Sequence, residues 1–361
     1  MDEREKLSSI DGEGMFSKIN TPRELTVSRV VQETPDAVSI WFDVPERQWE
    51  VFSYDPGQFL TLRIPGSGDG KPVARCYSLS SSPYAEDELA VTVKRTAGGY
   101  GSNWLCDNIV AGATMTVLPP SGHFTPKDFD ADMVFLAAGS GITPIISIVK
   151  SALLEGGGHL VLFYANQDAE SVIFGEDLRY LAKQFPERLN LIEWLESERG
   201  LPDRETLSEL CGAYQNRMYF VCGPAAFMDL VVDVAHQVGV PHRNLHREVF
   251  QSLRSDPFDI ENSVKQSMTT EQARLVVYLD GERAELQWPK DLSLVEVLLN
   301  EGFSPPYSCR EGGCGACVCK VVDGDIEMKV NDVLDEDDLE EGDRLACQSV
   351  PITDTVTVTF D

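Results

Sequence analysis

Short hydrophobic runs alternate with turn-forming residues over the first third of the chain. The runs are LTVSRVVQ, AVSIWFDV, QFLTLRI, LAVTVKR and TMTVLPP, between Pro22 and Lys127, and each is rich in β-branched or aromatic residues. Many short strands separated by Gly and Pro are typical of an antiparallel barrel or sandwich. We therefore predict an antiparallel β-barrel domain over residues 21–128.

The hydrophobic pattern changes after Asp130. Buried strands such as MVFLAA, HLVLFYAN and LNLIEWL now alternate with the helix-length segments IISIVKSALLE and DLRYLAKQF. This alternation predicts an α/β domain with a parallel sheet, over residues 129–252, with RMYFVCG as its last strand.

A third pattern follows a polar stretch, residues 253–272, that we interpret as a linker. A hairpin-like pair, RLVVYLDGERAELQW with Asp280 and Gly281 at the turn, precedes a helix, SLVEVLLNEG, and a last strand, VTVTF. These elements predict a compact α+β (β-grasp) domain over residues 273–361. Residues 1–20 contain no apolar run and are predicted to be a disordered tail.

Length and charge narrow the possible functions. The 361 residues suggest two or three domains, and 59 acidic against 30 basic residues give a formal net charge of -29. Such acidity argues against nucleic acid and anionic membrane surfaces as partners. With no secretory signal and no apolar run long enough to span a bilayer, we expect a cytoplasmic protein.

Five of the nine cysteines lie in the last 53 residues. Cys309, Cys314 and Cys317 have C-x4-C-x2-C spacing, and Cys347 follows far downstream, which is the plant-type arrangement for a [2Fe-2S] cluster. Gly312, Gly313 and Gly315 would let backbone N–H groups approach the sulfur atoms. A zinc site is the alternative, but zinc knuckles usually carry two C-x2-C pairs. Cys319 is interpreted as a buried thiol outside the cluster.

Two glycine-containing turns in the α/β domain could bind phosphate. One follows MVFLAA, where glycines allow close approach and the following residues suit a helix start; the other ends RMYFVCG and opens a helix at the same edge of the sheet. An ordinary strand-to-helix turn is the alternative for the first. The residues are Gly139, Gly141, Thr143, Pro144, Cys222, Gly223 and Pro224.

The barrel carries residues that suit a planar, phosphorylated cofactor. An arginine, an aromatic ring and a serine occur together in RCYS, residues 75–78, followed by VKR and by GSNW, residues 101–104. Arg75 could neutralise a phosphate, Tyr77 could stack on a ring, and Ser102 could begin a short helix that receives another phosphate. Each signal is weak alone, but their order is informative.

Together these motifs resemble the ferredoxin–NADP reductase superfamily, in the variant with a plant-type ferredoxin domain fused at the C-terminus. The resemblance runs from about Thr21 to Asp361. Within it, RCYSLSSSP, AVTVKRTAGGYGSNWLCD, YANQDAESVIFG and VNDVLDEDDLEEG are similar to the reductase components of 3-ketosteroid 9α-hydroxylases.

The resemblance implies roles for individual residues. Ser78 and Cys222 would lie at the hydride-transfer point, and the end of the reductase part would reach the flavin through Glu248 and Phe250, although Phe250 could equally be a core aromatic. The other implied contacts are those of Arg75, Tyr77 and Ser78 with the flavin, of Val93 and Lys94 with its ring and ribityl chain, of Gly101 and Ser102 with the pyrophosphate, and of Gly139, Gly141, Thr143, Pro144, Gly223 and Pro224 with the nucleotide.

The resemblance also implies the cofactors and the reaction. FAD matches the RCYS-to-GYGSNW pattern better than FMN, and electrons would pass from NADH through FAD and the [2Fe-2S] cluster to a Rieske-type terminal oxygenase acting on a steroid ring. NADH rather than NADPH is favoured because the loop from Tyr164 to Ser171 carries two carboxylates and no base.

Alternative interpretations stay open. The acceptor could be another oxygenase, a hybrid-cluster protein or a desaturase, and a non-enzymatic electron carrier is disfavoured by the intact nucleotide motifs. His242 and His246 are interpreted as part of an exposed connection rather than a metal site. The acidic run from Asp335 to Glu341 is either a docking patch or a solvated loop. We expect a monomer.

Overall fold

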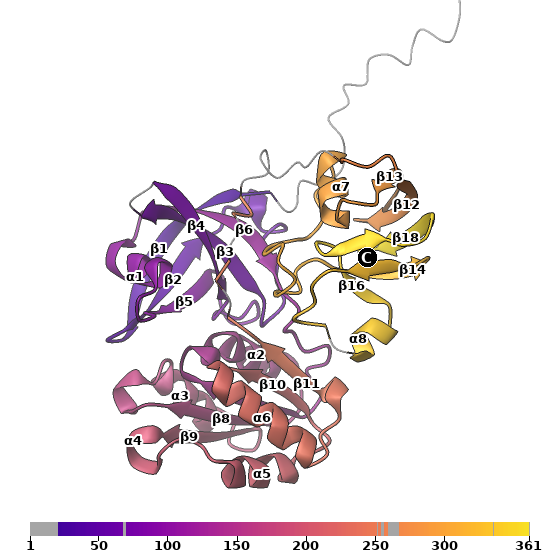
Figure 1. Cartoon of the computed structure of the whole chain (residues 1–361). Helices are drawn as coiled ribbons and strands as arrows, with labels where there is room; N and C mark the ends of the chain where they lie inside the picture. The colour runs from indigo at the N-terminus through magenta and orange to yellow at the C-terminus, as the bar shows by residue number, and fades with distance from the viewer. Residues whose placement is uncertain are drawn as a thin grey trace, which may run out of the picture.

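A computed structural model describes residues 21–67, 70–250, 252–253, 256–258, 267–334 and 336–360. Three sheet-containing domains follow one another along the chain, and Figure 1 shows the ferredoxin-like third domain beside the barrel, with the α/β domain beneath both. The predicted tail over residues 1–20 and most of the predicted linker lie outside the described residues.

The first domain is an antiparallel sheet of six strands in the order β4-β3-β6-β1-β2-β5. A bridge between Leu79 and Val91, and the hydrogen bond from Ser80 N to Ala90 O at 2.8 Å, join the end of β4 to β5 and close the sheet into the predicted barrel. Its elements are β1 (Arg23–Thr34), β2 (Ala37–Asp43), β3 (Phe59–Ser67), β4 (Lys71–Ser78), β5 (Leu89–Lys94), α1 (Tyr100–Asn108) and β6 (Thr114–Ser121).

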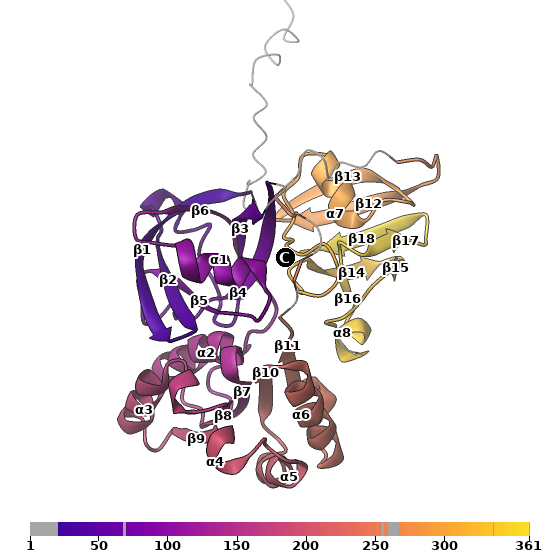
Figure 2. The ribbon, with the colours of Figure 1, turned by 60° about the vertical axis from the view of Figure 1, so that its left-hand side comes forward.

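The second domain is a parallel sheet in the order β11-β10-β7-β8-β9 with helices on both faces (Figure 2). Strands β7 and β8 are buried along their whole length, which explains their uninterrupted apolar sequences. The elements are β7 (Met133–Ala138), α2 (Ile142–Glu155), β8 (Leu160–Asn166), α3 (Gly175–Gln184), β9 (Leu189–Leu195), α4 (Glu196–Arg199), α5 (Arg204–Ala213), β10 (Met218–Cys222), α6 (Ala225–Gln237) and β11 (Leu245–Glu248).

Strand β11 corrects two sequence predictions. RMYFVCG is not the last strand of this sheet, because β11 pairs in parallel with β10 and places Glu248 opposite Cys222. His246 belongs to this strand rather than to an exposed connection, and its ring stacks on Phe220 with centroids 5.0 Å apart. The strand was missed because an edge strand of four residues with the sequence LHRE has no apolar alternation.

The third domain is a mixed sheet in the order β13-β12-β18-β14-β16, with a separate β15-β17 pair. The hairpin is confirmed: Asp280 and Gly281 both have positive φ, 54° and 73°, as a two-residue turn of this kind requires. Its elements are β12 (Gln272–Leu279), β13 (Glu282–Pro289), α7 (Leu294–Asn300), β14 (Val318–Asp323), β15 (Ile326–Met328), α8 (Glu336–Glu340), β16 (Asp343–Leu345), β17 (Ser349–Pro351) and β18 (Thr355–Thr359).

A capping box starts helix α7 of this domain, and helix α8 is formed by part of the acidic run. Helix α7 begins with a capping box in which the Ser293 side chain accepts from Glu296 N and the Glu296 carboxylate accepts from Ser293 N. Five residues of the acidic run form the short helix α8 rather than a loop. The core between α7 and the sheet is centred on Trp288, which is fully buried.

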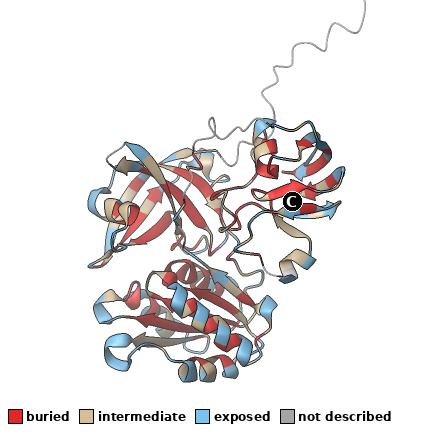
Figure 3. Ribbon diagram, viewed as in Figure 1, coloured by how far each residue is buried: buried red, intermediate tan, exposed pale blue. Residues whose placement is uncertain are grey.

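The domains also contact one another through part of the predicted linker. Phe258 is buried against Ala74 and Leu118 of the barrel, and Asp256 forms an ion pair with Arg63 at 3.2 Å. Figure 3 shows buried residues concentrated along the strands of all three domains. Residues 253 and 256–258 are therefore anchored to the barrel surface, whereas Ser267 and Met268 donate hydrogen bonds to Asp291 of the third domain.

Candidate active site and redox centres

A cavity of about 230 Å³ lies between β4, the start of α1 and the start of α2. It brings together residues from RCYS, from GYGSNW and from the glycine turn that follows β7, which are distant in sequence. The lining residues are Arg75, Cys76, Tyr77, Ser78, Thr92, Lys94, Thr96, Gly99, Tyr100, Gly101, Ser102, Ser140, Thr143, Phe250 and Ser252.

The start of α1 is shaped to receive a phosphate group. Its N-cap is Gly99, and no side chain caps the helix, so its first N–H groups face the cavity. A side chain at Gly101 would displace its neighbours, because a Cβ would lie 2.9 Å from Ile64 Cδ1 and 3.0 Å from Arg75 Cγ. Close backbone approach, unused helix donors and a neighbouring guanidinium fit the pyrophosphate of FAD.

Two residues of strand β5, Val93 and Lys94, were predicted to contact the flavin, and their side chains point to opposite faces of the strand. Lys94 lines the cavity, as does Thr92, whereas the side chain of Val93 is fully buried in the barrel core. Only the backbone of Val93 is therefore placed for a cofactor contact. Lys94 also forms an ion pair with Asp36, with 3.6 Å between Lys94 Nζ and Asp36 Oδ2.

The turn between β7 and α2 meets the end of β10 at the point where the strand order reverses. Gly139 has a positive φ of 54°, and a Cβ on Gly141 would lie 2.1 Å from the Cys222 carbonyl oxygen. The 3-10 turn Gly139–Gly141 runs directly into α2, and the Ile142 N–H donates to Gly139 O and Ser140 O, so any backbone donors for a ligand come from the turn itself. Such switch points are where open α/β sheets bind nucleotides.

The other predicted residues of these two turns are Thr143, Pro144 and Pro224. Thr143 does not cap α2: it lies inside the first turn, and its hydroxyl donates to Ser140 O at 3.1 Å. Pro144 is buried in the same turn, and Pro224, the N-cap of α6, is exposed beside Gly223.

Ser78, Glu248 and Cys222 form a group of interacting side chains at the junction of the first two domains. Ser78 Oγ donates to Glu248 Oε2 at 2.8 Å, and Glu248 lies opposite Cys222 in the β10-β11 ladder. Burial raises the pKa of Glu248 to about 8, although the Ser78 hydrogen bond lowers it, and burial followed by the Glu248 carboxylate raises the pKa of Cys222. A carboxyl group that is protonated at neutral pH can hold or donate a proton.

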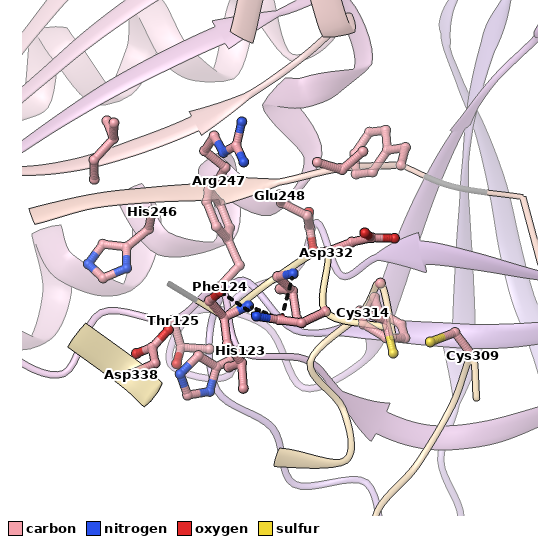
Figure 4. A pocket seen from close by; sticks show the side chains of 18 of the residues that line it. His123, Phe124, Thr125, His246, Arg247, Glu248, Cys309, Cys314, Asp332 and Asp338 are labelled. Carbon is pink, nitrogen blue, oxygen red and sulfur yellow. Dashed lines mark hydrogen bonds between the residues drawn. The ribbon is translucent and has the colours of Figure 1, made fainter. Parts of the chain in front are cut away.

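A larger cavity of about 630 Å³ continues from this group to the third domain. Figure 4 shows Glu248, His123 and Phe124 around it, with Cys309 and Cys314 at its other side. Cys76, Ser78 and Phe250 line both cavities, and Phe250 is 47% exposed, so it is not a core aromatic.

The four predicted ligand cysteines lie together. Figure 4 shows the sulfur atoms of Cys309 and Cys314 directed toward each other. Hydrogen bonds from the Cys314 and Cys347 thiols, with help from the Glu311 and Gly313 N–H groups, lower the pKa of Cys309 to about 2. The reciprocal interaction with Cys309 raises the pKa of Cys347 and of Cys314.

The loop around these cysteines directs donors at sulfur. Glu311 N lies 3.3 Å from Cys309 Sγ, Cys347 N lies 3.5 Å from Cys317 Sγ, and Gln348 Nε2 lies 3.5 Å from Cys347 Sγ. Gly312 and Gly315 have positive φ, and a Cβ on Gly312 would lie 2.9 Å from Val330 O. Cys319 is buried in the core behind the loop.

This donor set fits a binuclear cluster. Across the described residues, no group of three or more His, Cys, Asp or Glu side chains surrounds one point as the ligands of a single ion would. A [2Fe-2S] cluster requires four thiolates shared between two irons, with N–H donors to the sulfurs. None of the nine cysteines, all of which are described, forms a disulfide.

Two residues between the flavin cavity and the cysteine loop were missed by sequence reasoning. Thr61 on β3 and Ser308 beside Cys309 share a hydrogen bond of 2.7 Å, and Cys76 Sγ lies 3.5 Å from Thr61 Oγ1 and 3.6 Å from Ser308 Oγ. Burial raises the pKa of Cys76 to about 11. The position of Ser308 beside a cluster ligand was the only sequence signal for this contact.

Hydrogen bonds hold the Asp168 carboxylate, one of the two carboxylates in the loop after β8. Asp168 caps the 3-10 turn Ala169–Ser171, accepting from Ser171 N at 2.9 Å, and Ser171 Oγ accepts in turn from Asp168 N. Glu170 is exposed beside it.

Comparison with known protein families gives each domain a description. Residues 24–125 match the oxidoreductase FAD-binding domain, residues 135–233 the oxidoreductase NAD-binding domain, and residues 277–351 the 2Fe-2S iron-sulfur cluster binding domain. The chain is 52% identical over 338 residues to the ferredoxin reductase component of 3-ketosteroid-9-alpha-monooxygenase from Rhodococcus rhodochrous, covering 93% of this chain and 96% of that protein.

This chain belongs to the ferredoxin–NADP reductase superfamily. The reductase is also 35% identical over 359 residues to one of the subunits of 1,2-phenylacetyl-CoA epoxidase from Escherichia coli, covering 95% of this chain and 99% of that protein. The predicted superfamily, the enzyme class and the FAD, NAD and [2Fe-2S] cofactors are confirmed.

Solved structures confirm the predicted fold class of the reductase. Phthalate dioxygenase reductase aligns with a TM-score of 0.53 at 20% identity, over 94% of this chain and 98% of that one. Among the described residues, no helix is long and apolar enough to span a membrane.

Proposed function

We propose that this protein is the NADH-dependent reductase component of an oxygenase system, delivering electrons to a Rieske-type terminal oxygenase that hydroxylates a 3-ketosteroid at C9. The 52% identity to the corresponding component of 3-ketosteroid-9-alpha-monooxygenase, over nearly the whole of both chains, carries this proposal. Three cofactor sites that lead into one another support it.

The cofactors supply the redox chemistry: FAD accepts a hydride from NADH and passes single electrons to the [2Fe-2S] cluster. The protein positions these groups. Arg75 and the uncapped start of α1 hold the flavin pyrophosphate, and Gly141 lets the start of α2 and the nucleotide lie beside Cys222.

Proton handling falls to Ser78 and Glu248. The Glu248 carboxyl, with a pKa of about 8, keeps its proton at neutral pH, and the Ser78 hydroxyl that donates to it lines both cavities. We infer that these two groups exchange a proton with the flavin site through Ser78 Oγ. Phe250 also lines both cavities.

We infer NADH as the electron donor from the loop after β8. The Asp168 carboxylate is held by its capping hydrogen bonds, and a 2′-phosphate placed beside it would be repelled. The base nearest in sequence, Arg179, is engaged in a two-bond pair with Glu193, at 3.0 and 2.8 Å.

We infer that the partner is a terminal oxygenase, because the matched relatives are reductase components of oxygenase systems. Nine cysteines with no disulfide fit the reducing cytoplasm as the place of action. A second acceptor should be tested, because the matched component of 1,2-phenylacetyl-CoA epoxidase also covers nearly the whole chain at 35% identity.

An anaerobic NADH titration of the purified protein, followed by absorbance, tests the electron route. We expect flavin bands and a broad long-wavelength cluster absorption that NADH bleaches. A protein that binds zinc and no flavin would contradict the proposal. Reconstitution with a 3-ketosteroid hydroxylase or with the other epoxidase components then separates the two acceptors by product formation.

A further inference from the structure

We propose that Thr61, Cys76 and Ser308 are positioning residues that dock the cysteine loop of the third domain onto the flavin barrel and so fix the path of electrons between the two. This inference rests on the proposed electron route. It assigns a function to a side-chain cluster that lies outside the Ser78, Glu248 and Cys222 group.

Burial makes this contact significant. Thr61 is fully buried and Ser308 is 1% exposed, so each hydroxyl has exchanged water for partners across the domain junction. Their hydrogen bond of 2.7 Å joins residues 247 positions apart. Separating the domains would replace this bond by bonds to water, so it favours the docked arrangement by the modest net contribution of one buried hydrogen bond.

Position makes the contact relevant to electron transfer. Ser308 directly precedes the cluster ligand Cys309, and Cys76 lies between Arg75 and Tyr77, which line the flavin cavity. Cys76 lines both this cavity and the larger one that Cys309 and Cys314 also line. The cluster of three side chains is therefore the direct polar contact between the flavin wall and the loop of ligands.

The step itself is simple. One electron leaves the NADH-reduced flavin and reduces one ferric iron of the cluster to ferrous, and no bond to Thr61, Cys76 or Ser308 forms or breaks. The three residues act by holding the domains together. Weakening them should increase the population of undocked molecules without changing either redox centre.

Thr61→Val and Ser308→Ala test this contact from its two sides, in the full-length protein with both cofactors bound. Exposed hydroxyls supply matched controls: Thr355→Val on β18 and Ser197→Ala on α4. The first readout is alkylation of Cys76 by N-ethylmaleimide, followed by peptide mass spectrometry, because separation of the domains exposes this partly buried thiol further and its labelling rate then rises with the open population.

We expect each test variant to label about 3- to 10-fold faster than wild type, since one lost hydrogen bond changes an equilibrium by about that factor. The double variant should label no faster than the more affected single variant, because both substitutions remove the same bond. Flavin absorbance and cluster electron paramagnetic resonance must show full occupancy in every sample.

The second readout is single-turnover reduction of the cluster after NADH mixing. We expect slower cluster reduction in both test variants, with flavin reduction and the potentials of both centres as in wild type. Wild-type labelling and wild-type cluster reduction in both variants would overturn this inference. A wild-type protein whose cluster NADH does not reduce would instead overturn the proposed function.

Discussion

The Ser78 hydroxyl donates a hydrogen bond to Glu248 Oε2 at 2.8 Å, across 170 residues of sequence. One partner ends strand β4 of the barrel and the other ends strand β11 of the parallel sheet. The carboxyl group to which we assign proton handling is thus held by two domains at once.

Glu248→Gln should remove a pH-dependent loss of stability. The folded pKa of about 8 lies above the ordinary value of 4.5, so the folded protein binds more protons than the unfolded one between these pH values. Wild-type stability should therefore fall as pH rises from 4.5 through 8. We expect the variant to be more stable at pH 9 by about 2–4 kcal/mol, since one pKa unit corresponds to about 1.4 kcal/mol.

Denaturation midpoints of wild type and variant, measured from pH 5 to pH 9, check this expectation. The two curves should converge near pH 5, separate progressively between pH 5 and pH 8, and run parallel above pH 8. Parallel curves over the whole range would show that the carboxyl group has no raised pKa.

Cys314→Ser should separate the two redox centres. We expect NADH to reduce the flavin at the wild-type rate, whereas reduction of a one-electron acceptor such as cytochrome c through the cluster is lost. Cys319→Ala is the matched control, because Cys319 is buried in the core behind the loop and does not belong to the four ligands. It should keep the cluster and lose only about 1 kcal/mol of stability. Loss of flavin reduction in a folded Cys314→Ser protein would show that the order of carriers is wrong.

Asp168→Asn should weaken discrimination against NADPH. Asparagine keeps the capping hydrogen bond to Ser171 N but removes the charge. Removing a repulsion of about 1 kcal/mol should raise kcat/KM for NADPH about fivefold, with a smaller change for NADH. Steady-state kinetics with both nucleotides measures this ratio. An unchanged ratio would place the 2′ position of the ribose away from this loop.

Gly141→Ala should disrupt the junction between α2 and β10. The new Cβ would lie 2.1 Å from the Cys222 carbonyl oxygen, so the helix must move, at a cost of about 1–3 kcal/mol. Displacement by about 1 Å near a reaction centre is enough to reduce kcat/KM for NADH at least about tenfold.

The control is Gly212→Ala in α5, where nothing lies within 4 Å of the added Cβ. It should stabilise the helix by about 0.5–1 kcal/mol and leave the kinetics unchanged. Wild-type kinetics in the Gly141→Ala protein would mean that the nucleotide does not approach this turn.

Motifs that are contiguous in sequence were predictable, and contacts between motifs were not. The cysteine spacing predicted Cys309, Cys314, Cys317 and Cys347 as the ligands because ligand geometry imposes a fixed local pattern. Strand β11 escaped because its stability comes from pairing with β10 rather than from its own four polar-rich residues.

The placement of single side chains also depended on tertiary structure. Alternation along β5 buries Val93 and turns Lys94 to the cavity, which a motif comparison does not distinguish. Thr61 has no neighbour of chemical interest in the sequence, and its short hydrogen bond to Ser308 exists only because the third domain docks on the barrel.

The two faces of strand β4 limit which insertions into the chain this enzyme can accept. Arg75 packs beside Gly101 of α1, while the next residue, Cys76, turns to the opposite side and meets Ser308 of the third domain. Residues of this one strand therefore line the flavin cavity and also contact the cysteine loop. Inserting a single residue into β4 would reverse the facing of every side chain beyond it and so exchange the two sides. The connecting segments can vary in length, but this strand cannot.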